Sequence, residues 1–99
     1  MRQVPRSSAA ILAWSGRTAP CEVAWVEGDH LELRLGDTLG PGTEATLRLP
    51  RSARPLVLPV TVKSHTPDCP APGNHLLIVQ IASRSGSLRR QLESWIGEG

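Results

Sequence analysis

The sequence predicts a small all-β domain, a six-stranded antiparallel barrel with one C-terminal α-helix. Nine prolines and nine glycines among 99 residues indicate many turns, which favours short strands over a helical bundle. Several short segments alternate apolar and polar residues with a period of two, and one segment near the C-terminus has helical spacing. Closing the strands into a barrel would remove the exposed edges that otherwise promote aggregation.

The predicted strands are short runs in which apolar residues alternate with polar ones or follow one another directly. In the second run, alternation places Cys21, Val23 and Trp25 on one face. In the fourth run, alternation places Ala45, Leu47 and Leu49 inward. We therefore expect six strands, at Ala9–Trp14, Pro20–Val26, Leu31–Leu35, Thr43–Leu49, Leu56–Val62 and His75–Ile81.

Proline interrupts the fifth of these runs at Pro59. Because proline lacks an amide donor, it predicts a sheet edge or a bulge at that point. The segment Thr66–Asn74 contains three prolines and is expected to be a loop.

The helix is expected over Ser87–Ile96, where apolar residues recur on one stripe. A helix of this length is unstable alone, so it should dock on the barrel. Ser87 is the expected N-cap, and Gly97 is expected to end the helix. The stripe consists of Leu88, Leu92, Trp95 and Ile96.

Charge and cysteine content narrow the classes of function. The net charge of +2 is too small to indicate general nucleic-acid binding. Cys21 and Cys69 match no zinc or redox spacing, so free thiols in a reducing compartment are expected. The apolar run at Ala9–Trp14 is too short for a signal peptide or a membrane span. We therefore expect a cytoplasmic protein of one domain that is not inserted in a membrane.

Two arginines stand four residues apart at the start of the chain, in Arg2-Gln3-Val4-Pro5-Arg6. Guanidinium groups fork onto phosphate oxygens and stack on bases, so such a pair suits a nucleotide ligand. A solvated basic arm is the alternative for the same residues.

The layout resembles the PilZ domain family. The Arg2–Arg6 segment fits that family's Arg-x-x-x-Arg motif, and Leu31–Leu35 with Ala45–Leu49 resembles its third and fourth strands. Leu88–Ile96 resembles its closing helix. The resemblance implies an arginine-bearing arm at residues 1–8, a PilZ-like barrel with its helix at 9–96, and cyclic di-GMP as the ligand. It also implies a role in bacterial signalling.

The family's second motif, Asp/Asn-x-Ser-x-x-Gly, is absent. Alignment on Leu31 puts Trp25, Glu27 and His30 at its three positions. Trp25 could stack on a purine, and Glu27 could accept guanine protons but would repel a phosphodiester. Glycine is replaced by His30, which disfavours a turn that needs positive φ there. The expected ligand-binding residues are therefore Arg2 and Arg6, with Glu27 and Trp25 as weaker candidates.

These residues lead to one function with two alternatives. We expect a regulatory module with weak or no nucleotide binding that acts by protein contact. The resemblance implies a partner in motility, pilus, secretion or exopolysaccharide machinery. A working cyclic di-GMP receptor, through Arg2 and Arg6, is the first alternative. A small barrel that binds single-stranded nucleic acid is the second, although the chain has no Tyr or Phe for base stacking.

Neither an enzyme nor a metal protein is expected. The sequence offers no triad or carboxylate pair in a defined arrangement, so no catalytic residue is assigned. His65, Cys69 and His75 flank a proline-rich loop, which offers no defined scaffold for a metal. No cofactor is expected.

Overall fold

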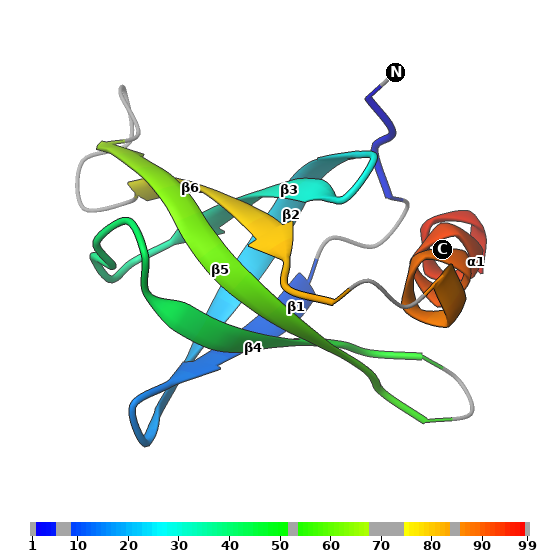
Figure 1. Ribbon diagram of the computed structural model, residues 1–99, viewed down its shortest axis with the longest axis horizontal. Helices are drawn as coiled ribbons and strands as arrows, with labels where there is room; N and C mark the ends of the chain where they lie inside the picture. The colour runs from blue at the N-terminus through cyan, green and yellow to red at the C-terminus, as the bar shows by residue number, and fades with distance from the viewer. Residues whose placement is uncertain (1, 6–8, 52–53, 68–74, 84–85, 99) are drawn as a thin grey trace.

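The computed structural model describes residues 2–5, 9–51, 54–67, 75–83 and 86–98. These residues form a closed antiparallel barrel of six strands in the order β1-β2-β3-β6-β5-β4, with one helix outside it (Figure 1). The predicted fold class is therefore confirmed. The elements are β1 (Ala9–Trp14), β2 (Arg17–Glu27), β3 (His30–Leu35), β4 (Glu44–Leu49), β5 (Leu56–Pro67), β6 (His75–Ile81) and α1 (Gly86–Glu98).

The barrel interior is filled by aliphatic side chains, and the described residues bury no polar or charged residue. Strand alternation sends one face of each strand inward. In β4, for example, Ala45, Leu47 and Leu49 are buried, as predicted, and their neighbours are exposed. The most deeply buried side chains are Leu12, Leu31, Leu33, Leu47, Leu49, Leu58, Leu77 and Val79.

Strand β2 begins three residues earlier than predicted, at Arg17 rather than Pro20. The cause is the preceding turn, in which Ser15 (φ 46°) and Gly16 (φ 74°) both have positive φ. Two such residues make the tight turn whose twist matches a β-hairpin. Trp14 therefore pairs directly with Arg17, and the ladder has no intervening loop.

The prediction that Trp25 shares a face with Cys21 and Val23 is wrong. The pairing of β2 with β3 shifts register between Val23 and Trp25, so one extra residue enters β2. This bulge reverses the alternation, and Val26 is buried instead while Trp25 is only half-buried. Bulges re-aim side chains in this way, and here the bulge moves an indole to the outer surface.

Strand β5 is also longer than predicted, because it runs through Pro59 and on to Pro67. The carbonyl of Pro59 accepts a hydrogen bond from the Ala82 amide at 2.8 Å. In an antiparallel ladder the nitrogen and carbonyl of one residue face the same neighbour. The proline nitrogen therefore faces the end of β6, and the pairing with β4 is kept. The bulge in β5 lies later, between Val62 and Ser64.

Helix α1 lies beside the barrel, near the β4–β5 hairpin (Figure 1). Leu92 and Trp95 are buried, as the stripe predicts, and the Trp95 Nε1–H donates to the carbonyl of Pro50 at 3.0 Å. Ser87 lies inside the helix, where its Oγ accepts from Gln91, so it is not the N-cap. Among the described residues, no helix is long and apolar enough to cross a membrane.

The helix also continues past its predicted end. Gly97 is helical, and the last helical residue is Glu98. Glycine weakens a helix but does not forbid its last turn.

Candidate functional site

A shallow hollow of about 430 Å³ lies on the outer face of β2, β3 and β6. Two cross-strand rows form its floor. Trp25 pairs with Glu32, which pairs with Ile78, and Glu27 pairs with His30 in the next row. Strand pairing brings these side chains together from three segments that are far apart in the sequence. The hollow is lined by Arg2, Trp25, Glu27, His30, Glu32 and Ile78.

The N-terminal segment is held beside this hollow by one backbone bridge. The Gln3 amide donates to the Val26 carbonyl at 2.7 Å, and the Val26 amide donates back to Gln3 at 2.8 Å. The bridge continues the sheet along β2 beyond the start of β1. It places Arg2 over the outward-facing side chains of β2. The N-terminal segment lies next to the β2–β3 turn (Figure 1).

Arg2 contacts two of the predicted site residues. Its guanidinium carbon lies 4.3 Å from the centre of the Trp25 ring, a cation–π distance. Its Nε lies 3.4 Å from a carboxylate oxygen of Glu27. The two charged side chains are 64% and 50% exposed, so the ion pair is worth only about 0.2–1 kcal/mol. Trp25 and Glu27 thus orient the Arg2 side chain. A ligand that binds Arg2 would have to share it with these two residues or displace them.

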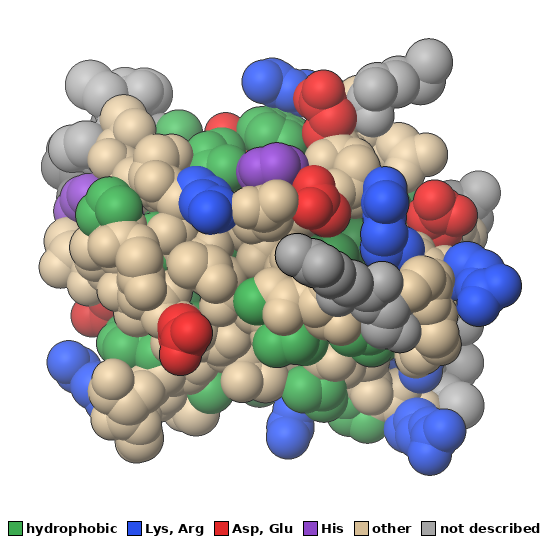
Figure 2. Space-filling model, in the orientation of Figure 1, with side chains coloured by type: hydrophobic (Ala, Val, Ile, Leu, Met, Phe, Trp, Pro, Cys, Tyr) green, Lys and Arg blue, Asp and Glu red, His purple; other side chains and the backbone are tan. Residues whose placement is uncertain are grey.

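The charge balance of the hollow opposes a phosphate ligand. Among the lining residues, Arg2 is the one fixed positive charge, whereas Glu27 and Glu32 are both acidic. Over the visible face of the molecule, side chains of both signs lie close together (Figure 2). Arg6, the second predicted phosphate-binding residue, lies outside the described residues.

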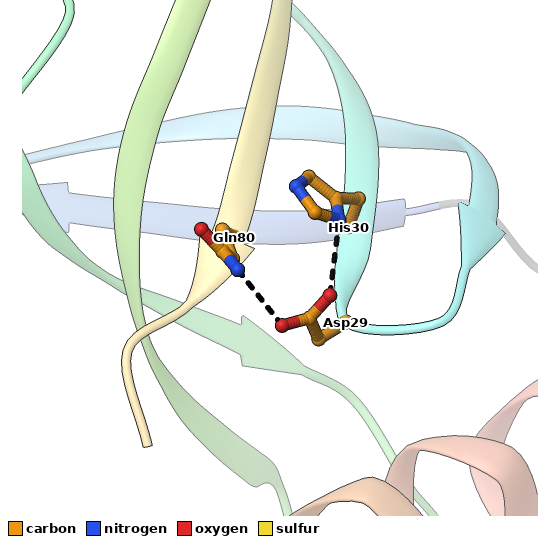
Figure 3. A network of polar contacts seen from close by, with 3 residues as sticks. All are labelled: Asp29, His30 and Gln80. Carbon is orange, nitrogen blue, oxygen red and sulfur yellow. Dashed lines mark hydrogen bonds and ion pairs between the residues drawn. The ribbon is translucent and has the colours of Figure 1, made fainter. Parts of the chain in front are cut away.

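The edge of the hollow is fixed by a polar network at the β2–β3 turn (Figure 3). The Gln80 amide donates to Asp29 Oδ2 at 2.9 Å, and His30 Nδ1 lies 3.0 Å from Asp29 Oδ1. The Gln80 hydrogen bond is the main cause that lowers the Asp29 pKa, and a backbone hydrogen bond, His30 and Arg89 lower it further. The network therefore holds His30 toward the hollow.

The turn itself is accommodated by Gly28, which has φ of +61°. His30, at the position where the PilZ motif has glycine, begins strand β3 instead. The positive φ of this turn thus lies at Gly28, two residues before the position of the motif's glycine. No strain arises at His30 from its side chain.

The structure brings Arg2, Trp25 and Glu27 together, three of the four residues that the sequence singles out as ligand-binding. It adds Glu32 and Ile78, which the sequence analysis did not identify. Only the pairing of β3 with β2 and β6 shows that both residues lie next to Trp25.

Comparison with known proteins gives a likeness of fold. No protein-family model matches the chain, and no curated protein sequence matches it. Among solved structures, the Borreliella burgdorferi PlzA protein in complex with c-di-GMP matches with a TM-score of 0.57. The fold is PilZ-like. The two chains are 15% identical, and the match covers 94% of this chain but 46% of PlzA, so this chain spans about half of that protein's length.

Proposed function

We propose that this chain is a PilZ-type regulatory module of cyclic di-GMP signalling whose own nucleotide affinity is weak or absent and which acts by protein contact. The PilZ-like fold supports the class of module. The hollow supports the weak affinity, because Arg2 is already paired with Glu27 and Glu32 lines the same surface. A phosphodiester that bound there would lie near the carboxylates of Glu27 and Glu32. It would also compete with Glu27 for the guanidinium of Arg2.

A titration with cyclic di-GMP tests the nucleotide part. We expect no saturation below about 100 µM for the wild type, which corresponds to binding weaker than about 5.5 kcal/mol. Calorimetry and tryptophan fluorescence are suitable readouts, since Trp25 lines the hollow. Glu27→Gln should raise the affinity by about 1.4- to 5-fold, because it releases a surface ion pair.

The control variants are Arg2→Ala and Arg6→Ala, which should leave such weak binding unchanged or lower. Micromolar or tighter binding by the wild type that disappears in Arg6→Ala would overturn the proposal. That result would favour the working receptor, with both arginines on the ligand.

The protein-contact part is supported by a second outer surface, which lies on β1, β4 and β5. Ile11 and Val57 are each 44% exposed. Register pairs Ile11 with Arg48 and Arg48 with Val57, so the three form one row across β1, β4 and β5. A hollow of about 330 Å³ beside the row is lined by Ala9, Ala10, Ile11, Pro20, Arg48, Pro50 and Pro55. Apolar side chains beside one arginine suit a partner segment that carries both aliphatic side chains and carboxylates.

A photo-crosslinking amino acid at position 11 tests this surface in cells. We expect crosslinking to one discrete polypeptide, which is lost when Arg48→Glu is added. The matched control carries the crosslinker at Glu93, an exposed position on α1. Equal crosslinking from both positions, or no effect of Arg48→Glu, would argue against this surface. The PilZ resemblance directs the search for the partner to motility, pilus, secretion and exopolysaccharide components.

A further inference from the structure

Two of the three histidines of this chain meet at the far end of the β5–β6 ladder. His65 Nε2 lies 2.8 Å from His75 Nδ1, and the ring centres are 4.7 Å apart. His65 pairs with Leu77, and His75 pairs with Pro67, so the two histidines are diagonal neighbours on one face of the ladder. Both are half-buried. Their side chains therefore leave two well-fixed strands and converge on one point.

The facing nitrogens share one proton in this arrangement. One imidazole donates through its N–H, and the other accepts with a ring lone pair. A divalent transition-metal ion can replace that proton, because it accepts lone pairs from both nitrogens. Neutral imidazole is the commonest protein ligand for such ions.

The distance between the nitrogens suits that replacement. Tetrahedral zinc binds imidazole nitrogen at about 2.0–2.1 Å, which places two ligand nitrogens about 3.3–3.4 Å apart. For both lone pairs to reach one ion, the observed 2.8 Å separation has to open by about half an ångström, and the two rings have to turn from facing each other toward a common point. The strands fix both backbones in advance, so little ordering is needed when a metal binds.

We propose that His65 and His75 together bind one divalent transition-metal ion, such as Zn²⁺, at this end of the barrel. The site is distinct from the hollow that contains His30, and it does not depend on nucleotide binding. Cys21 offers no competing thiolate near neutral pH, because it is buried and its pKa is raised to about 12.

A zinc titration of the full chain tests the proposal by calorimetry and by thermal unfolding. The wild type should bind one Zn²⁺ and unfold at a higher temperature with Zn²⁺ than with EDTA. His65→Ala and His75→Ala should each lose most of the zinc affinity, because each variant removes one of the two proposed ligands. His30→Ala is the matched control and should bind like the wild type. In NMR spectra of the histidine ring nitrogens, zinc should shift the signals of His65 and His75 and leave those of His30 in place.

Three results would overturn the proposal. The first is the absence of zinc binding by the wild type up to about 1 mM, where the binding free energy is only about 4 kcal/mol. The second is unchanged binding in both His65→Ala and His75→Ala. The third is binding that Cys69→Ser abolishes although neither histidine variant affects it. Should His65→Ala fail to fold, His65→Gln removes the ring nitrogen in a larger side chain, and the same outcomes apply.

Discussion

The buried Trp95 offers a direct test of how α1 is joined to the barrel. Trp95 is 4% exposed, and its indole donates to the Pro50 carbonyl at 3.0 Å. Truncation of a buried tryptophan to alanine typically costs about 3–5 kcal/mol, which here includes a carbonyl left without its donor. Domains of this size have about 5–15 kcal/mol of stability in total. Trp95→Ala should therefore remove a large share of the free energy of unfolding and lower Tm by at least about 12 °C.

Urea denaturation followed by two probes measures this effect. Far-UV circular dichroism reports on the helix, while the fluorescence of the remaining Trp14 and Trp25 reports on the barrel. We expect both transitions to move together to lower urea, with an unchanged m-value. Trp95→Phe is the control, because it keeps an aromatic ring and loses the donor, and it should cost about 0.5–3 kcal/mol. A loss below about 1 kcal/mol for Trp95→Ala, or a barrel transition that stays in place, would refute the cooperative docking of α1.

Two further predictions concern titratable groups. Burial raises the pKa of Cys21 to about 12, so in a Cys69→Ser background a thiol reagent at pH 8 should react no faster than the protein unfolds. Rapid labelling of the native protein would contradict this prediction. The free energy of unfolding should also fall as the pH rises above about 9, because the Cys21 thiol ionises there in the unfolded chain but not in the folded protein. The Asp29 pKa is lowered mainly by the Gln80 amide, so Gln80→Leu should raise the carboxyl titration midpoint measured by NMR. A carboxyl group whose pKa is lowered by folding stabilises the fold at pH values above its unfolded pKa. This stabilisation disappears as the pH falls through the folded-state pKa of Asp29. Gln80→Leu should therefore lose less stability than the wild type on acidification. An unchanged midpoint in Gln80→Leu would show that another group sets it.

Much of the fold was predictable because its signals are local. Alternation in Leu31–Leu35 and around Leu47 depends only on whether neighbouring side chains face the core or the solvent. The strand ends at Trp14 and Ile81 are also as predicted. The helix stripe through Leu92 follows from its 3.6-residue period in the same way.

The site was predictable only in part. The sequence supplied Arg2, Trp25 and Glu27 as candidates, but it predicted Trp25 on the same face as Cys21 and Val23, because simple alternation takes no account of a bulge. The bulge in β2 arises where β2 meets β3, so no pattern within β2 alone reveals it.

The sequence by itself therefore determined the class of fold, the aliphatic core and the identity of the candidate side chains. Tertiary structure decided which side chains meet. Trp25, Glu32 and Ile78 come from three strands, and the contact between His65 and His75 depends on the register of β5 against β6. The physical reason is that local periodicity is set by the geometry of one strand, whereas register is set by pairing between strands that are distant in the chain.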